Sequence, residues 1–388
     1  MLTKAYLDVP FHRSDMGEEE VQAVTDVIHS GWLTTGEKTA QFEREFAQYV
    51  RASHAVAVSS CTAALHLSLD AIGLRPGDEV LVPTNTFTAT AEAVTYTSAK
   101  PVLVDIDPST LNISPEDAER KITPRTRAII PVHVAGLPCD LDEIHALAET
   151  HKLRIVEDAA HALPSSYRGR RIGAISELTA FSFYSTKTLS TGEGGMVTTD
   201  DESYARRIRA MRLHGISKDG NPRSDAGSWR YEVQETGYKY NLTDLQSALG
   251  IVQLAKCDAM SQARRRIAES YTRAFQSLEA VETPFAQPDR ESSWHLYVLR
   301  LQTHRLGIDR DRFIQELGEL GVHASVHFIP LHLQPAYQKR FGYKEGDLPA
   351  AEQEYSRYIS LPIYPTMTGA AVEYVISSVA DVVALFSR

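Results

Sequence analysis

The chain has 388 residues, a formal net charge of -10 and 43% hydrophobic residues, which are typical of a globular protein of two or three domains. The acidic balance argues against nucleic acid as a partner, because nucleic-acid binding needs a basic surface. Cys61, Cys139 and Cys257 match neither a disulfide framework nor a metal-binding spacing. We find no signal peptide and no apolar run of about 20 residues, the length that crosses a membrane. The sequence therefore predicts a cytoplasmic protein without membrane contact.

From residue 53 to residue 200, short β-branched runs alternate with segments of helical length. The predicted strands are Ala55–Val58, Glu79–Val82, Val102–Ile106, Ala128–Val132, Arg154–Asp158, Leu178–Phe183 and Met196–Thr199. The predicted helices are Thr62–Ile72, Phe87–Thr97, Pro115–Ile122, Leu141–His151 and Glu202–Met211. Several of these strands are apolar throughout, as strands buried on both faces are. The alternation predicts an α/β fold with a mostly parallel sheet and helices on both of its faces.

The pattern changes after residue 221. Asn221–Ser228 is rich in turn residues and predicts an exposed loop, and Thr243 opens a long helical region. The predicted elements that follow are a strand at Leu296–Leu301, a helix at Asp309–Leu320, a strand at Val322–Phe328 and a terminal helix. We interpret residues 1–255 as an N-terminal segment with a large domain, and residues 256–388 as a smaller C-terminal α+β domain. The charged runs Arg168–Arg171 and Arg264–Arg266 are predicted to be solvated surface.

Lys187 is the strongest candidate for a reactive group. An apolar strand ends four residues before it, and the glycine-rich segment Gly192–Gly195 follows it. Burial disfavours the charged ammonium and makes the neutral amine available, which Schiff-base formation requires. A lysine on a surface loop is the plainer interpretation of this one feature.

Two further features suit the chemistry of a Schiff-base lysine. Asp158 ends a predicted strand, at the edge where open α/β sheets bind ligands, and a carboxylate there suits a protonated pyridine nitrogen. Ser60, Cys61 and Thr62 begin a predicted helix, where amides and hydroxyls suit a phosphate group. Helix capping explains each feature equally well when it is taken alone. Together an amine, a ring-nitrogen partner and an anion cradle indicate a pyridoxal-phosphate (PLP) site.

A series of segments in this order resembles the DegT/StrS-type sugar-nucleotide aminotransferases, a family of fold-type-I PLP enzymes. The segments are Glu157–His161, Ser182–Gly195, Gly237–Asp244, Trp294–Tyr297 and His327–Tyr337. The motifs are most similar to those of enzymes that form UDP-4-amino-4-deoxy-L-arabinose and of other nucleotide-4-keto-sugar aminotransferases. The resemblance extends from Gly31 to nearly the end of the chain. Cys61 departs from the family, since many members have glycine there.

The resemblance implies roles for individual residues. Lys187 would be the Schiff-base lysine and proton shuttle, with Asp158 and His161 as the other catalytic groups. The implied cofactor contacts are Ser60, Cys61, Thr62, Phe87, Asp158, His161, Ser182, Lys187 and Asn241. Asn241 would come from the neighbouring subunit, so that a homodimer shares its active sites. The implied substrate contacts are Trp32, Lys239, Tyr240, His327 and His332, with His332 at the sugar end of the pocket.

The implied reaction moves the amino group of L-glutamate onto a nucleotide-linked keto-deoxysugar, a UDP- or dTDP-4-keto-6-deoxyhexose. It would be ping-pong, with 2-oxoglutarate released and pyridoxamine 5'-phosphate as the intermediate cofactor form. A non-catalytic PLP-binding regulatory protein, or an aminotransferase of a cyclitol or other non-nucleotide ketone, stays open as an alternative.

Two other classes are disfavoured. A short-chain dehydrogenase has three residues between its tyrosine and lysine, whereas two separate Tyr184 from Lys187, and no G-x-G-x-x-G turn follows the first strand. A zinc site at His323, His327 and His332 lacks an acidic partner at metal-binding spacing, so we predict no metal.

Overall fold

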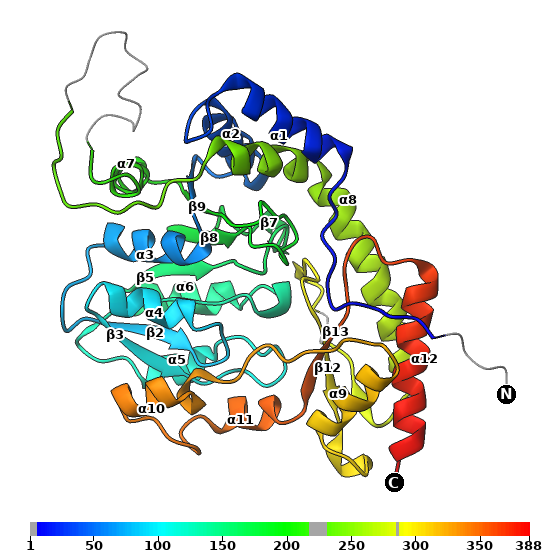
Figure 1. Cartoon of the computed structure of the whole chain (residues 1–388). Coiled ribbons are helices and arrows are strands. Elements are labelled where there is room, and N and C mark those ends of the chain that lie inside the picture. The colour runs from blue at the N-terminus through cyan, green and yellow to red at the C-terminus, as the bar shows by residue number, and fades with distance from the viewer. Residues whose placement is uncertain (1–5, 217–230, 285–286) are drawn as a thin grey trace.

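The centre of the protein is a seven-stranded sheet, shown in Figure 1. The computed structural model describes residues 6–216, 231–284 and 287–388, so the predicted loop Asn221–Ser228 lies outside the described residues. In spatial order the strands are β1 (His54–Val58), β9 (Gly195–Thr199), β8 (Leu178–Ser182), β5 (Arg154–Asp158), β4 (Thr126–Ile129), β2 (Glu79–Pro83) and β3 (Lys100–Val104). Strand β9 is antiparallel to both neighbours, and the other pairs are parallel. The predicted strands and the mostly parallel sheet are confirmed.

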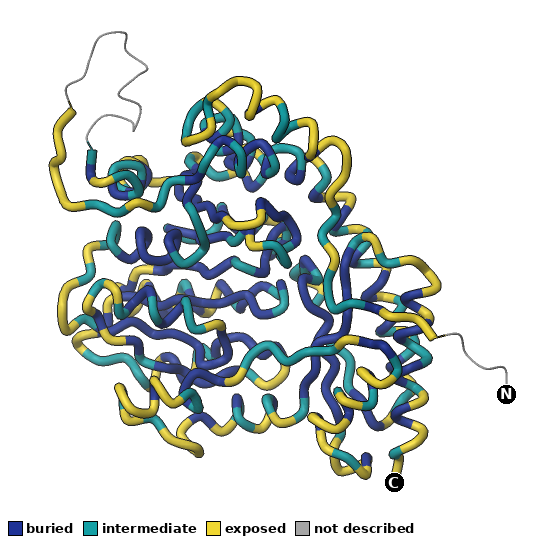
Figure 2. The backbone as a smooth tube through the Cα atoms, in the orientation of Figure 1, coloured by how far each residue is buried: buried dark blue, intermediate teal, exposed yellow. Residues whose placement is uncertain are grey.

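Helices cover both faces of this sheet, as predicted. The helices of this layered part are α2 (Glu37–Val50), α3 (Cys61–Ala71), α4 (Ala89–Tyr96), α5 (Pro115–Arg120), α6 (Leu141–His151) and α7 (Glu202–Met211). In β1, Ala55 and Ala57 belong to the core that contains Phe42 of α2, whereas Val56 and Val58 belong to the opposite core. Alternate residues therefore bury opposite faces of the strand. Figure 2 shows the strands buried and the outer helices exposed towards solvent.

One long helix joins the two parts of the molecule. Helix α8 (Asp244–Phe275) begins at Thr243, which forms a capping box with Gln246. The start of α8 packs against α1 (Glu18–Ser30) and α2, and its later turns reach α12 (Gly369–Phe386). The helix runs without interruption through residues 255 and 256, the boundary that the sequence predicts between the two domains.

The small domain is built on an antiparallel sheet of β10 (Val281–Glu282), β12 (Tyr297–Leu301) and β13 (Tyr358–Leu361). Helices α9 (Arg310–Glu319) and α12 complete its core. The predicted strand Val322–Phe328 is wrong. Its residues form only isolated bridges, from Val322 to Val9 and from Ser325 to Ser360, so the segment meets the edge strand β13 at one residue pair without joining the sheet.

Part of the C-terminal sequence returns to the large sheet, as Figure 1 shows for α10 (Pro335–Phe341) and α11 (Pro349–Tyr355). The hydroxyl of Tyr343 accepts a hydrogen bond from the N–H of Leu103 at 2.8 Å, and Asp105 accepts one from the N–H of Ala351 at 2.8 Å. The remaining short elements are β6 (Ser166–Tyr167), β7 (Arg170–Arg171), β11 (Arg290–Glu291), and the 3-10 helices η1 (Val134–Gly136), η2 (Thr303–Arg305) and η3 (Leu331–Leu333). The sequence did not predict these elements.

Helix α12 is long and apolar enough to cross a membrane, by length and composition alone. This corrects the expectation that the chain has no such segment. Its buried residues include Val375, Val379 and Val382, which pack in the core of the small domain. Apolar helices of globular proteins pass the same test as membrane spans, and α12 packs one face into the core of the small domain.

Candidate active site

A cavity of about 590 Å³ lies where the carboxyl ends of β2, β5 and β8 face the small domain. Ligands of open α/β sheets bind at this edge because the loops that follow parallel strands converge there. Most of the residues predicted for the site line the cavity: Ser60, Cys61, Thr62, Phe87, Asp158, His161, Ser182, Lys187 and His327. The fold thus brings together segments that lie more than a hundred residues apart in the sequence.

Lys187 lies in the loop between β8 and β9, and only part of its side chain reaches solvent. Burial lowers its pKa to about 8, and the charge of Asp158 opposes this lowering. The loop is held from the N-terminal segment: His12 Nε2 donates to the carbonyl of Ser185 at 3.1 Å, and the hydroxyl of Ser14 donates to the same oxygen at 2.9 Å. A substantial fraction of neutral amine is therefore present near neutral pH.

Asp158 is the last residue of β5 and is almost fully buried. Its Oδ2 accepts a hydrogen bond from Thr90 Oγ1 at 2.8 Å, and its Oδ1 accepts one from the N–H of Ala160 at 3.1 Å. Burial raises the pKa of the carboxyl, and these two hydrogen bonds and the charge of Lys187 oppose that rise. The carboxylate is thus held in one orientation beside the cavity that Lys187 also lines.

The start of α3 forms a cradle for an anion. Ser60 caps the helix by accepting a hydrogen bond from the N–H of Ala63 at 3.1 Å. The N–H groups of Cys61 and Thr62 precede the first intrahelical bonds, so they are free to meet a ligand. Strand β9 passes close beneath: a Cβ on Gly195 would lie 2.6 Å from the carbonyl group of Ser60. This arrangement fits the phosphate of PLP.

Aromatic and imidazole rings line the remaining wall. The rings of His161 and His295 lie 4.3 Å apart between centroids, and Phe328 stacks near His161 at 6.0 Å. Phe87 is more than half exposed and lies 5.7 Å from Phe328. Burial lowers the pKa of both His161 and His295 well below the ordinary range, and the positive charge of Lys187 lowers both further. His327 has a pKa lowered to about 4 for the same reasons. These imidazoles are neutral at physiological pH.

Five predicted residues do not line this cavity: Trp32, Lys239, Tyr240, Asn241 and His332. Asn241 pairs with β1 of its own chain, and its side chain bonds Thr35 Oγ1 at 2.7 Å. His332 is fully buried, with Nδ1 2.8 Å from Thr84 Oγ1 and Nε2 2.8 Å from Glu352 Oε1. Since both of its ring nitrogens are engaged by the protein, the structure does not support the sugar contact expected of His332.

Several lining residues were missed by the sequence prediction. They include Phe11, His12, Asn85, Thr90 and His295. Thr90 follows Phe87 by one helical turn, and His295 lies within a segment already noted for its resemblance, so both had a local signal. His12 had none, because its contact with Ser185 spans 173 positions.

The three histidines considered for zinc have separate partners. His323 bonds Asp8 at 2.7 Å, His327 bonds Ser360 at 3.0 Å, and His332 bonds Thr84 and Glu352. Within residues 6–216, 231–284 and 287–388, no group of three or more metal-ligating side chains is placed to hold a metal ion.

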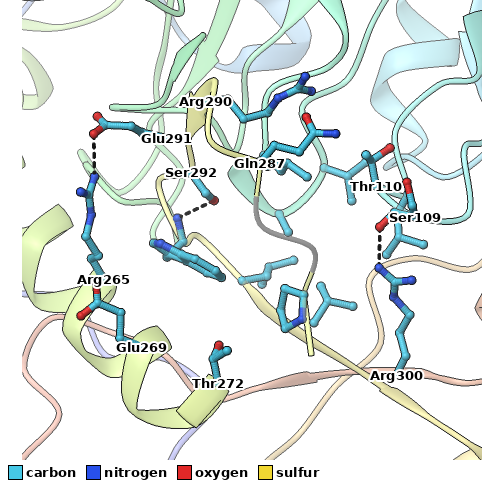
Figure 3. Close-up of a pocket in the computed structure, with 18 of the residues that line it drawn as sticks. Ser109, Thr110, Arg265, Glu269, Thr272, Gln287, Arg290, Glu291, Ser292 and Arg300 are labelled. Atoms are coloured by element: carbon cyan, nitrogen blue, oxygen red, sulfur yellow. Dashed lines mark hydrogen bonds and ion pairs between the residues drawn. The ribbon is translucent and has the colours of Figure 1, made fainter. Parts of the chain in front are cut away.

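A second cavity of about 670 Å³ adjoins the first at Val134 and Leu296, and Figure 3 shows its polar lining. Three of its four lining arginines, Arg290, Arg300 and Arg265, have acidic partners. Arg290 pairs with Asp140 at 2.6 Å, Arg300 with Glu282 at 2.9 Å, and Arg265 with Glu291 at 3.4 Å. The charges of these three arginines are already offset, so they do not by themselves make this cavity a strong anion site.

Comparison with known proteins identifies the class. The model of the DegT/DnrJ/EryC1/StrS aminotransferase family matches residues 14–380. The chain is 50% identical over 385 residues to the spore coat polysaccharide biosynthesis protein SpsC of Bacillus subtilis (strain 168), covering 99% of each chain. The chain belongs to this aminotransferase family and is a PLP-dependent enzyme.

Two solved structures support the same assignment. The putative sugar aminotransferase Spr1654 from Streptococcus pneumoniae, in its PMP form, superposes with a TM-score of 0.92 at 34% identity, covering 98% of each chain. DesV of S. venezuelae, in complex with a ketimine intermediate, superposes with a TM-score of 0.89 at 36% identity, covering 97% of this chain and 98% of that chain. The predicted family, fold and cofactor are confirmed.

Proposed function

We propose that this enzyme transfers the amino group of L-glutamate to a nucleotide-linked keto-deoxysugar, a UDP- or dTDP-4-keto-6-deoxyhexose, by a ping-pong mechanism. The observation that carries the proposal is the placement of Lys187 and Asp158 in one cavity, with the amine's pKa lowered to about 8. A sugar acceptor is supported by the relatives, since SpsC is named for polysaccharide biosynthesis and Spr1654 as a putative sugar aminotransferase.

The residues divide the chemistry between them. Bound PLP would supply the electron sink that makes the proton on the amine-bearing carbon removable. Lys187 would hold the cofactor at rest and, once released, move that proton as a general base and then acid. Asp158 would keep the ring nitrogen protonated through a charge-assisted hydrogen bond. Ser60, Thr62 and Ser182 would bind the phosphate, and Phe87 would cover the ring.

The active unit in this proposal is a homodimer in the cytoplasm. Asn241 lies outside the cavity of its own chain, and the resemblance assigns it to the phosphate of the neighbouring subunit. Phe87 and Tyr184 line the cavity yet are 58% and 46% exposed, so the mouth of the site has apolar surface that a second copy would cover. Size-exclusion chromatography with light scattering tests this, and a monomer at working concentration would contradict it.

The experiment that tests the reaction is the visible absorption spectrum of the purified protein with PLP, before and after L-glutamate. We expect a yellow band in the wild type that L-glutamate bleaches, and no such band in Lys187→Ala. A band that ignores L-glutamate and other amino donors would support the non-catalytic alternative.

A second measurement identifies the acceptor. The bleached enzyme is mixed with a UDP- or dTDP-4-keto-6-deoxyhexose, with the sugar freed of its nucleotide, or with a cyclitol ketone. We expect the yellow band to return only with the nucleotide-linked sugar. Its return with the cyclitol ketone alone would replace the proposed substrate by the non-nucleotide class.

A further inference from the structure

Arg264 of α8 is buried among backbone carbonyls. Its side chain is 1% exposed, so the prediction of a solvated surface run is wrong for this residue. Its Nη1 donates to the carbonyl of Ile363 at 2.7 Å and approaches that of Trp294 at 3.4 Å, while its Nε has no hydrogen-bond partner. Among the residues that the structure describes, no carboxylate forms an ion pair with it.

A buried guanidinium without a carboxylate is costly, because water no longer solvates the charge. Burial lowers the pKa of Arg264 to about 10, so the group is still charged at neutral pH. The bonds to the two carbonyls require N–H donors but not a positive charge, since an amide side chain donates equally. The charge itself is therefore unexplained by the packing.

The two carbonyls place this charge directly behind the active-site cavity. Ile363 lines the cavity, and Trp294 is joined through its peptide bond to His295, which also lines it. His12, a third lining residue, has its pKa lowered to about 4 by burial first and by the charge of Arg264 second. Ile363, His12 and His295 form what we call the small-domain wall.

Acidic groups inside the cavity do not offset this charge. Asp158 lies on the large-domain side, where Thr90 and Ala160 hold it, and Glu193 is exposed. The neighbouring arginine, Arg265, has a carboxylate partner. Arg265 lines the second cavity and pairs with Glu291 at 3.4 Å; Figure 3 draws this ion pair.

We propose that the small-domain wall receives a carboxylate of the amino donor, and that Arg264 supplies the positive charge that favours it. The proposal rests on the transamination proposed above and names the group by which the donor is recognised. Arg264 does not line the cavity, so it is a specificity-determining residue that acts through the wall. Its field is weakly screened there, because buried charges are shielded less than exposed ones.

The test separates charge from hydrogen bonding. Arg264→Gln keeps N–H donors for the two carbonyls and removes the charge, whereas Arg264→Lys keeps the charge. Arg265→Gln is the matched control, one residue along the same helix. For each PLP-loaded variant, the concentration of L-glutamate that half-bleaches the yellow band is measured. We expect a rise of about tenfold or more for Arg264→Gln, and about threefold or less for the other two.

Amide analogues of the donor show which carboxylate is bound. L-glutamine lacks the side-chain carboxylate, and isoglutamine lacks the α-carboxylate. We expect the analogue that lacks the bound carboxylate to half-bleach the wild type only at a higher concentration than L-glutamate does. Arg264→Gln should not change that concentration. If both analogues equal L-glutamate in the wild type, or if Arg264→Gln and Arg264→Lys change all three donors alike, the proposal is wrong and Arg264 is structural.

A binding readout keeps this proposal distinct from the reaction. Glutarate has no amine, so it tests the site without turnover, and its diamide is the uncharged control. We expect glutarate but not the diamide to raise the Tm of the PLP-loaded wild type and of Arg265→Gln, and to leave that of Arg264→Gln unchanged. If L-glutamate does not bleach the wild type, then L-glutamate is not the amino donor. A rise in Tm with glutarate would still support the carboxylate site. If Arg264→Gln does not fold, equal effects of glutarate and diamide on the wild type overturn the inference.

Discussion

His133 Nε2–H donates a hydrogen bond to Glu157 Oε2 at 2.7 Å, and neither side chain is exposed to solvent. The tautomer follows from the other ring nitrogen, because Nδ1 accepts a hydrogen bond from the N–H of Cys139 at 3.1 Å. Glu157 Oε1 accepts from the N–H of Ser176 at 3.1 Å. The N–H of His133 also donates to the carbonyl of Asp158 at 3.2 Å. This buried pair thus fixes the end of β5 that presents Asp158 to the cavity.

Glu157→Gln is expected to destabilise the protein by about 1–3 kcal/mol, because the amide has one acceptor oxygen for two fixed donors. Chemical denaturation measures this, with Glu116→Gln as a control. Glu116 is 83% exposed and pairs with Arg120 within a helix, so its loss should cost about 0.5 kcal/mol or less. Equal effects of the two substitutions would contradict the role of the pair.

The same pair has a pH signature. Burial would raise the pKa of Glu157, but the hydrogen bond from His133 and further contacts bring it below the ordinary value. A carboxyl with a lowered pKa contributes stability that is present above its unfolded pKa and is lost as pH falls through the folded pKa. The difference between wild type and Glu157→Gln should therefore shrink only below about pH 4.5.

Thr90→Val is expected to weaken PLP binding about tenfold at neutral pH, because Asp158 loses a hydrogen bond to its charged form. The bond from Thr90 lowers the pKa of Asp158 against the effect of burial, so its loss raises that pKa further. Acid release of the cofactor should then begin at higher pH in the variant. Absorption titrations with PLP at a series of pH values measure both effects. Thr95→Val is the matched control, since Thr95 bonds only the carbonyl of Glu92 in its own helix.

The amine of Lys187 should titrate near pH 8 in the protein freed of PLP, because burial opposes its charge. Competitive acetylation read by mass spectrometry follows this single lysine, and an ordinary lysine peptide titrates near about 10.4. The charge of Asp158 helps to hold the pKa of Lys187 up, so Asp158→Asn should lower it further. An upward shift in that variant would show that the carboxylate does not act on the amine.

The sequence was most informative where a site residue ends a strand. Asp158 ends one apolar run and Lys187 follows another, and both runs are predicted strands of one parallel sheet. Because the carboxyl ends of parallel strands lie at the same edge, the two residues were predicted to lie close together. Non-local contacts were not predictable. Arg264 belongs to a run of three arginines, and the sequence does not show that one of the three is buried against backbone carbonyls.

The same limit explains the errors in the small domain. Val322–Phe328 has the composition of a strand, but a strand also needs a continuous run of paired residues, and only Ser325 of this segment pairs with the edge strand β13. Helices α10 and α11 are only seven residues each, too short for a periodic pattern to stand out. His12 reaches the site through its hydrogen bond to Ser185, a contact that no local sequence pattern indicates.

All three cysteines are expected to resist thiol reagents in the native protein. Burial raises the pKa of Cys61 well above the ordinary value, the charge of Asp158 adds to this, and burial raises the pKa of Cys139 and Cys257 as well. Reaction with a disulfide reagent at about pH 8 should be at least tenfold slower than for a free thiol. Denaturation should then release all three. A fast-reacting thiol that disappears in Cys61→Ser would show instead that the start of α3 activates this cysteine.

Gly195→Ala is expected to reduce PLP affinity and to destabilise the protein by about 1–3 kcal/mol. The added Cβ would lie 2.6 Å from the carbonyl of Ser60 and 2.8 Å from the N–H nitrogen of Cys61, and neither backbone group moves without displacing the start of α3. Gly318→Ala is the control, because no atom lies within 4 Å of its added Cβ and the residue sits in α9. There alanine should stabilise by up to about 1 kcal/mol and leave PLP binding unchanged. If Gly195→Ala instead binds PLP as the wild type does, the close contact of β9 with the cradle is not what shapes the phosphate site.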